Sequence, residues 1–271
     1  MDYPVYFVSD STGITAETLG HNLLAHFPGA HFRAHTLRFI DTLDKARASA
    51  DAITRSVRES GLRPIVFATF ARPELRDALF ECDAHCLDLL GPFVGSIEAA
   101  LGIPSTHTIG HPHETATEPH YHRRMDAVNF ALAADDGAST KDYAQAQVIV
   151  VGVSRSGKTP TCLFLSLRYG IYAANYPLVE TDLDEQQLPA ALKPHRARLF
   201  GLGIDATRLH ELRTARQPAS DYAALKTCEY EVRQAEALFR AANIPWLSTT
   251  TLSVEEIAAS VVDRMGLASV A

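Results

Sequence analysis

Cysteine, tryptophan and long apolar runs are all scarce in this chain of 271 residues. No run approaches the roughly 18 apolar residues that a membrane helix needs, and the first residues lack the basic segment of a secretory signal. None of the four cysteines forms a C-x-x-C pair, which disfavours a zinc ribbon or a thioredoxin-type redox centre. We therefore expect a soluble, cytoplasmic protein with reduced, mostly buried thiols and no membrane contact.

An excess of positive charge is also lacking. Lys and Arg number 25 against 32 Asp and Glu, so the formal net charge is −7. Binding to nucleic acid draws most of its affinity from neutralising phosphates, so nucleic acid is not an expected partner. A small phosphorylated ligand remains compatible, because it needs only a local basic pocket. The apolar fraction of 46% is ordinary for a globular chain and excludes a disordered tail.

Short β-rich runs alternate with helical patterns along the chain. Strands are predicted at residues 5–9, 31–40, 64–70 and 86–90, and again at 147–151, 171–176, 198–204 and 245–249. Helices are predicted between them, with longer ones at residues 42–60, 221–243 and 254–265. This order predicts an α/β fold with a mostly parallel sheet.

A segment rich in Pro, Thr and His, residues 103–122, interrupts the alternation and is interpreted as a linker or a loop over a site. We therefore predict two domains. Residues 1–120 form an N-terminal α/β domain with a His-rich linker, and residues 121–271 form a second α/β domain with a mostly parallel sheet.

One sharp chemical motif lies in the second half. Residues 152–159 read GVSRSGKT and match G-x-x-x-x-G-K-[ST] at every fixed position, between a predicted strand and an apolar helix. Glycines let consecutive N–H groups face one anion, and the helix N-terminus adds partial positive charge. The candidate nucleotide- and phosphate-binding residues are therefore Gly152, Val153, Ser154, Arg155, Ser156, Gly157, Lys158 and Thr159.

Within this motif, Lys158 supplies a full charge to the terminal phosphates, and the hydroxyl of Thr159 is the predicted Mg²⁺ ligand. The motif alone fits an NTPase, a kinase or a GTP switch, and a plain Gly-rich turn is the alternative. No N/T-K-x-D motif is present, which disfavours a GTP switch, and no H-R-D or D-F-G motif supports a eukaryotic-type protein kinase. Asp205 ends the apolar run 199–205 and is equally interpretable as a second acidic element or as a helix cap.

Three further groups of polar residues have a plain structural interpretation beside a functional one. Residues 10–13 (DSTG) follow the first predicted strand and are either an anion or acceptor site or a simple turn. The histidines at 107, 111, 113, 120 and 122 match no usual zinc spacing, so exposed loop histidines are expected rather than metal ligands. The arginines at 208, 213 and 216 have roughly helical spacing, which favours a solvated face over a phosphate clamp.

The segment 151–177 (VGVSRSGKTPTCLFLSLRYGIYAANYP) resembles the phosphate-loop segment of the phosphoenolpyruvate synthase regulatory proteins, within the pyruvate, phosphate dikinase regulatory protein family. Residues 9–17 (SDSTGITAE) resemble the N-terminal signature of that family, and residues 135–137 (DDG) resemble its acidic turn. Four further segments resemble the C-terminal blocks of the family, at residues 200–202, 228–232, 244–246 and 253–257. Gly157 stands where the dikinase branch carries serine, which favours the synthase branch.

The resemblance implies a P-loop kinase-like second domain and a bifunctional Ser/Thr kinase and phosphorylase, with phosphoenolpyruvate synthase as partner. One reaction transfers the β-phosphoryl group of ADP to a threonine of the target and inactivates it. The other uses inorganic phosphate to remove that group, which releases pyrophosphate and activates the target. ADP is the implied donor, and Mg²⁺ is expected with it.

The implied catalytic residues are Lys158 and a carboxylate that takes the acceptor's proton. Asp136 in the acidic turn is the first candidate for that base, with Asp10 and Asp205 in reserve at predicted strand ends. The alternatives are the same chemistry on pyruvate, phosphate dikinase, a nucleotide-sensing binding protein without transfer, and a kinase of a small metabolite. A homodimer is left open, and the sequence sets neither the acceptor residue nor the oligomeric state.

Overall fold

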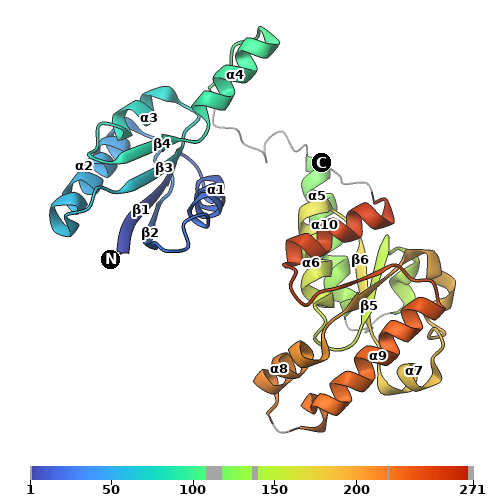
Figure 1. The fold of residues 1–271 in the computed structure, drawn as a ribbon. Helices are drawn as coiled ribbons and strands as arrows, with labels where there is room; N and C mark the ends of the chain where they lie inside the picture. The colour runs from blue at the N-terminus through green and yellow to red at the C-terminus, as the bar shows by residue number, and fades with distance from the viewer. Residues whose placement is uncertain (1, 108–117, 136–139, 219, 268–271) are drawn as a thin grey trace. The chain divides into compact units, whose positions relative to one another are not determined.

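The computed structural model describes residues 2–107, 118–135, 140–218 and 220–267. The chain divides into two compact units, Met1–Pro112 and His113–Ala271, each with its own four-stranded sheet (Figure 1). The sequence analysis places the division after residue 120. Residues 108–117, where the two units join, lie outside the described residues. Every strand pairing is parallel, so the predicted α/β fold is confirmed.

The first unit alternates strands with helices. Its elements are β1 (Asp2–Ser9), α1 (Ile14–Leu24), β2 (His31–Leu37), α2 (Leu43–Ser60), β3 (Ile65–Thr69), α3 (Pro73–Leu79), β4 (His85–Asp88) and α4 (Gly91–Leu101). The sheet order is β2-β1-β3-β4. Side chains of β1 alternate between the two faces: Val5 and Phe7 pack with α1, whereas Val8 packs with α2 and α3.

The second unit begins with a helix. Its elements are α5 (Glu118–Ala133), β5 (Val148–Gly152), α6 (Lys158–Tyr169), β6 (Ala173–Pro177), α7 (Glu180–Glu185), β7 (Leu199–Gly203), α8 (Ala206–Arg216), α9 (Leu225–Ala241), β8 (Trp246–Ser248) and α10 (Val254–Met265). Short 3-10 turns occupy Thr140–Ala144, Lys193–Arg198 and Asp221–Ala223. The sheet order β6-β5-β7-β8 repeats that of the first unit, although the sequence shows no internal repeat.

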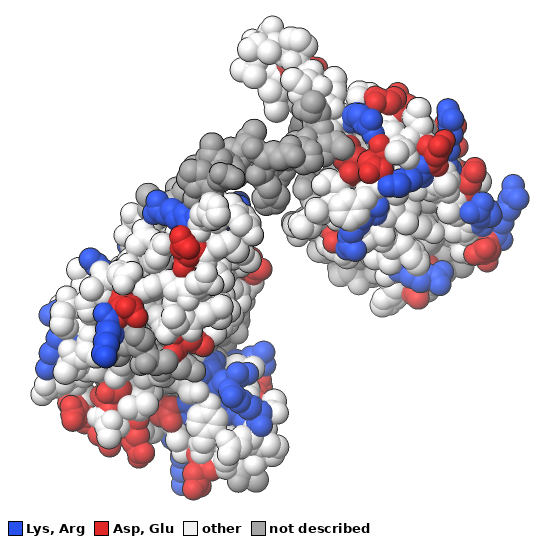
Figure 2. Space-filling model, turned by 180° about the vertical axis from the view of Figure 1, so that it is seen from behind, with Lys and Arg blue, Asp and Glu red and all other residues white. Residues whose placement is uncertain are grey.

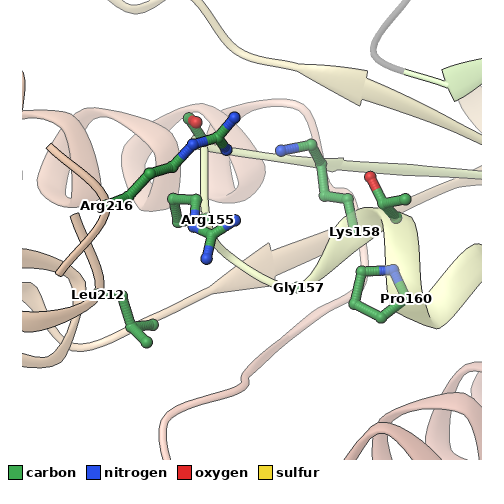
Figure 3. Close-up of a pocket in the computed structure, with 8 residues that line it drawn as sticks. Arg155, Gly157, Lys158, Pro160, Leu212 and Arg216 are labelled. Atoms are coloured by element: carbon green, nitrogen blue, oxygen red, sulfur yellow. The ribbon is translucent and has the colours of Figure 1, made fainter.

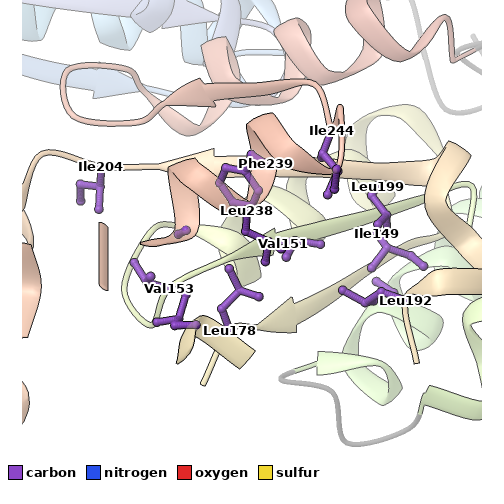
Figure 4. Close-up of a cluster of buried hydrophobic side chains, with 14 of the residues drawn as sticks. Ile149, Val151, Val153, Leu178, Leu192, Leu199, Ile204, Leu238, Phe239 and Ile244 are labelled. Atoms are coloured by element: carbon purple, nitrogen blue, oxygen red, sulfur yellow. The ribbon is translucent and has the colours of Figure 1, made fainter. Parts of the chain in front are cut away.

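Both faces of this second sheet are covered. Ile149 and Val151 point to one face and pack with α7 and α9, in the cluster drawn in Figure 4. Val148 and Val150 point to the other face and pack with α5, α6 and α10. Burial on both faces explains why β5 is a continuous apolar run rather than an alternating one.

Local signals set several helix ends. Ser253 accepts a hydrogen bond from the N–H of Glu256, and the carboxylate of Glu256 accepts one from the N–H of Ser253, so the two residues form a capping box at the start of α10. The single helix predicted over residues 221–243 is wrong at its start, because Ala224 is extended (ψ 134°) and α9 begins only at Leu225. α5 begins at Glu118, inside the predicted linker. The sequence pattern missed this start because the polar first turn of the helix has no apolar periodicity.

Helix α4 buries none of its side chains within the described residues, and Phe93 and Leu101 are more than 60% exposed. Glu98 is its one charged residue, and the helix is almost entirely white in Figure 2. Within the described ranges, none of the helices combines the length and apolar character needed to cross a bilayer.

Candidate phosphate-binding site

The candidate motif lies at the point of the second sheet where ligands are expected. Residues 152–159, called here the 152–159 loop, connect β5 to α6, as the sequence predicts. Within the sheet, β6 lies next to β5 on one side and β7 lies next to it on the other, so the chain that leaves β6 crosses over β5 to reach β7. The carboxyl end of β5 is therefore the topological switch point, where open parallel sheets bind ligands.

The backbone of this loop requires its glycines. A Cβ on Gly152 would lie 2.6 Å from both the carbonyl oxygen of Leu202 and Oγ of Ser156. Gly157 has φ 91° and Arg155 has φ 76°, both in the left-handed region. The N–H of Ser156 donates to the carbonyl of Val153 at 3.2 Å and closes a tight turn. Successive residues of opposite handedness form the kind of concavity that binds anions.

Lys158 is the first residue of α6 and is only 5% exposed. Its Nζ donates to the carbonyl oxygen of Val153 at 2.9 Å, so the ammonium group lies over the loop. Together with Ser154, Arg155, Gly157, Thr159 and Pro160 it lines a pocket of about 230 Å³, whose far wall is Leu212 and Arg216 of α8 (Figure 3). Because three cationic side chains and no acidic one line it, this pocket suits a phosphate chain.

Asp135 joins the loop to two other elements. Its Oδ1 accepts a hydrogen bond from Oγ1 of Thr159 at 2.8 Å, and the amide of Asn175 in β6 donates to the same oxygen. The residue lies two positions after the end of α5, whose C-terminal end thus meets the start of α6. From the sequence, Asp135 and Asp136 are interpretable either as residues that orient Mg²⁺ or accept the acceptor's proton, or as a plain helix-ending turn. The hydroxyl that Asp135 contacts is the one predicted to hold Mg²⁺.

The preferred base, Asp136, lies outside the described residues, so its role stays a prediction. Asp205 is the N-cap of α8: its Oδ1 accepts from the N–H groups of Thr207 and Arg208 at 2.9 and 3.0 Å. The cap interpretation accounts for this residue. Asp10 directly follows β1 in the other unit and accepts from the N–H of Ala71 at 2.8 Å. Burial raises the pKa of Asp10, and its backbone hydrogen bonds partly offset that effect.

The three arginines of α8 do not form one solvated face, and for Arg213 that prediction is wrong. Its side chain is fully buried and binds Glu231 of α9 with both terminal nitrogens, at 3.1 and 2.5 Å. Burial by itself lowers the pKa of Arg213, but the hydrogen bonds and charge of Glu231 outweigh it, so the net direction is upward. Arg208 is exposed and pairs with Glu211, as a solvated residue does.

Arg213 also contacts the 152–159 loop. Its Nη2 donates to the carbonyl oxygen of Ser154 at 3.2 Å, and its guanidinium lies 4.1 Å from the ring centroid of Tyr222. The hydroxyls of Tyr222 and Ser154 are 2.8 Å apart. Helical spacing alone gave no sign of this arrangement, because Arg213 lies between two exposed arginines of the same helix, Arg208 and Arg216. Its acidic partner is 18 positions away in the sequence.

The histidine segment is only partly described. His107 lies 3.9 Å from a carboxylate oxygen of Glu98, and His122 packs edge-on against Tyr121. His111 and His113 lie outside the described residues, as does the side chain of His120. Searched over the described ranges, the structure holds no group of three or more His, Cys, Asp or Glu side chains that would form a metal centre.

Fold and site together define a two-unit α/β protein with a lysine-bearing, glycine-containing loop, a candidate phosphate site, at the switch point of its second sheet. The profile of the kinase/pyrophosphorylase family matches residues 5–262, and the chain belongs to that family. The chain is 49% identical over 263 residues to a protein of Bordetella parapertussis and 50% identical over 264 residues to one of Azoarcus sp.. A protein of Alkalilimnicola ehrlichii is 49% identical over 263 residues.

Each of these alignments covers 97% of this chain and at least 95% of the relative. All three relatives carry the name "Putative phosphoenolpyruvate synthase regulatory protein". The resemblance found in the sequence motifs is therefore confirmed at the level of the family.

Proposed function

We propose that this protein regulates phosphoenolpyruvate synthase by two opposed phosphoryl transfers. In the first, the hydroxyl oxygen of a target threonine attacks the β-phosphorus of ADP. The bond to the bridging oxygen breaks, AMP leaves with the electron pair, and the hydroxyl proton passes to a carboxylate. In the second, an oxygen of inorganic phosphate attacks the phosphothreonine phosphorus. Pyrophosphate forms, and the threonine oxygen recovers a proton.

The observation that carries this proposal is the convergence of Lys158, Thr159 and Asp135 at the carboxyl end of β5, in a chain of the kinase/pyrophosphorylase family. The first reaction breaks a bond between two phosphates and the second forms one, so a single pocket for two phosphates serves both. A pocket of about 230 Å³ beside the 152–159 loop fits that requirement. The names of the relatives support the choice of target.

Mg²⁺ suits the oxygen atoms present. A threonine hydroxyl and a carboxylate oxygen 2.8 Å apart are the hard ligands that it prefers. Thr159 and Asp135 would hold the ion, which supplies charge neutralisation to the phosphates when bound. A magnesium site completed by substrate phosphates and water needs only one or two carboxylates, so the lack of a larger acidic cluster among the described residues does not argue against it.

Two residues share the remaining roles. Lys158 neutralises charge on the phosphoryl group in transfer, which stabilises the transition state in both directions. Asp136 takes the proton of the acceptor hydroxyl and returns it in the reverse reaction. A carboxylate beside several phosphates keeps a raised pKa, because like charges disfavour its ionisation, and a raised pKa makes proton return easier.

The direct test incubates the purified protein with phosphoenolpyruvate synthase and ADP labelled at the β-phosphate. Label on a threonine of the synthase supports the proposal, and its release as labelled pyrophosphate on adding unlabelled phosphate supports the second reaction. ATP labelled at the γ-phosphate, with adenylate kinase activity excluded, should give no transfer. A pocket that aligns a diphosphate presents the wrong phosphorus of ATP.

Other outcomes identify the alternatives. Transfer to pyruvate, phosphate dikinase instead of the synthase would change the target and keep the chemistry. Binding of ADP without transfer to either enzyme would indicate a nucleotide sensor, and label on a small molecule would indicate a metabolite kinase. Each of those results contradicts the proposal as stated.

A further inference from the structure

The pocket beside the 152–159 loop has a far wall that the motif does not predict. Leu212 and Arg216 of α8 line it opposite Lys158. Figure 3 shows the side chains of Arg216 and Lys158 extending toward each other from opposite sides. Arg155 is the third cation of the lining, and no acidic side chain is among the described residues that form it. The pocket thus presents three positive charges to whatever occupies it.

Contacts of Arg213 hold in place the helix that carries Arg216. Arg213 lies one helical turn earlier and is fully buried against Glu231, the carbonyl oxygen of Tyr222 and the carbonyl oxygen of Ser154. These contacts tie α8, α9 and the 152–159 loop together, so α8 moves away from the loop only if the hydrogen bond from Arg213 to the carbonyl oxygen of Ser154 breaks. Arg216 is therefore held at the pocket wall.

The two phosphates of the proposed reactions have different needs. The transferred phosphoryl group is shared by both reactions and lies with Lys158. The other phosphate is the α-phosphate of ADP in one direction and free inorganic phosphate in the other. We propose that Arg216 binds this second, non-transferred phosphate, an inference that rests on the proposed function. Arginine suits it, because its planar fork pairs with two phosphate oxygens at once.

An asymmetry between the two reactions follows. Inorganic phosphate carries close to two negative charges at neutral pH, whereas the α-phosphate of ADP carries about one, so the charge of Arg216 should contribute more to the binding of inorganic phosphate. Loss of one charge-assisted contact costs on the order of 10- to 100-fold in affinity. Arg216→Ala should therefore raise KM for inorganic phosphate in the dephosphorylation reaction by that factor. KM for ADP should rise less than about tenfold.

The same helix offers a matched control. Arg208 is also an exposed arginine of α8, but it pairs with Glu211 at 2.8 Å and does not line the pocket. Arg208→Ala should leave both KM values at the wild-type level, and Arg216→Lys should recover part of the phosphate affinity. Binding of pyrophosphate, measured by calorimetry on the full chain, should weaken in Arg216→Ala and not in Arg208→Ala.

Two outcomes overturn the inference. If KM for phosphate is the same in Arg216→Ala and Arg208→Ala, Arg216 binds no phosphate. If KM for ADP and for the phosphorylated synthase rise while KM for phosphate does not, Arg216 serves the transferred group instead. The calorimetric result separates this inference from the proposed function: a wild-type protein that binds pyrophosphate through Arg216 but transfers nothing would refute the function and keep the site.

Discussion

The two units repeat one sheet order and place different chemistry at the same point of it. In β2-β1-β3-β4 and in β6-β5-β7-β8, the first strand of the unit lies second in the sheet and is followed by the loop at the switch point. In the first unit that loop carries a buried carboxylate, Asp10, and in the second a buried lysine, Lys158. The fold supplies the location, and the residue types decide what can bind there.

The two loops also differ in what lies beside them. After β1, the carbonyl oxygens of Ser9 and Ser11 accept from the N–H groups of Ile40 and Phe39, and Arg38 donates to Thr12. Asp10 accepts from Ala71. Hydrogen bonds therefore hold this loop against its neighbours. The 152–159 loop is also hydrogen-bonded, to Arg213 and Thr249, but in addition it borders a pocket lined by three cationic side chains. The contrast predicts that the second loop serves chemistry and the first serves packing.

The largest effect should follow from removing the charge of the second loop. Lys158→Ala should abolish transfer in both directions, by on the order of 10³-fold or more, because both pass one phosphoryl group over the same ammonium. Label transfer from β-labelled ADP and release of pyrophosphate measure the two directions. Because Lys158 is buried and donates to Val153, Lys158→Met serves as a variant that keeps the apolar stem. Transfer at a near wild-type rate in either variant would contradict the site.

The next effect separates two adjacent carboxylates of the second unit. Asp136→Asn should keep ADP binding, measured by calorimetry, and lose on the order of 10²-fold in both activities, because it removes the base. Asp135→Asn should instead weaken Mg²⁺ binding by about 10- to 100-fold, because the amide oxygen can still accept from Thr159 and Asn175 but carries no charge.

A magnesium titration distinguishes these two roles. High Mg²⁺ should restore the activity of Asp135→Asn and leave Asp136→Asn inactive. If Asp136→Asn keeps full turnover while Asp10→Asn or Asp205→Asn abolishes it, the base lies elsewhere. In the case of Asp10, the contrast drawn between the two loops would then fail as well.

The sequence predicted the shared architecture well, and for a physical reason. The central strands of both sheets, β1 and β3 in the first and β5 and β7 in the second, are largely buried on two faces, so runs such as VIVV at residues 148–151 stand out against the polar helices. The 152–159 loop was predictable because its chemistry needs fixed residue types at fixed spacing. The repeated strand order was not, because topology depends on which strands pair and leaves no repeat in the sequence.

What escaped prediction depends on contacts between distant residues. Arg213 has the spacing of a solvated helix face, and only its burial against Glu231 shows otherwise. Asp135 gains its contact with Thr159 from the way α5 meets α6. The wall formed by Leu212 and Arg216 likewise exists only once α8 packs beside the loop. A pattern within one element cannot report such pairings.

A third effect tests whether the second unit depends on its buried ion pair. Glu231→Gln leaves the Arg213 charge without its partner, and breaking a buried pair costs about 3–5 kcal/mol. Because the side chain of Glu231 is 19% exposed, we expect about 3 kcal/mol at most, measured by urea unfolding. Affinity for ADP should also fall, since the pair holds the 152–159 loop.

The control lies on the same helix. Glu236 pairs with Arg240 at 2.6 Å on the surface of α9, where an ion pair contributes about 0.3–0.5 kcal/mol. Glu236→Gln should therefore change stability little and ADP affinity not at all. Equal effects of the two substitutions would mean that the Arg213–Glu231 pair does not position the loop.

The smallest effect concerns the buried carboxylate of the first unit. The pKa of Asp10 in the folded chain lies above the ordinary value of 3.8, chiefly because burial disfavours the charged form. Between those two pKa values the folded chain holds a proton that the unfolded chain has lost. The free energy of unfolding therefore falls as pH rises through this window, and the cost of ionisation is fully present at neutral pH.

Asp10→Asn removes that cost while its side-chain oxygen can still accept from the N–H of Ala71. Thermal unfolding of the full chain should show a modestly higher transition for the first unit at neutral pH. The difference from wild type should shrink as pH falls and vanish well below 3.8, where Asp10 is protonated in both states. A lower transition temperature at neutral pH would mean that the carboxylate is stabilised by its surroundings. The first loop would then favour a charged side chain, as we propose for the second loop, and the two loops would differ only in the sign of that charge.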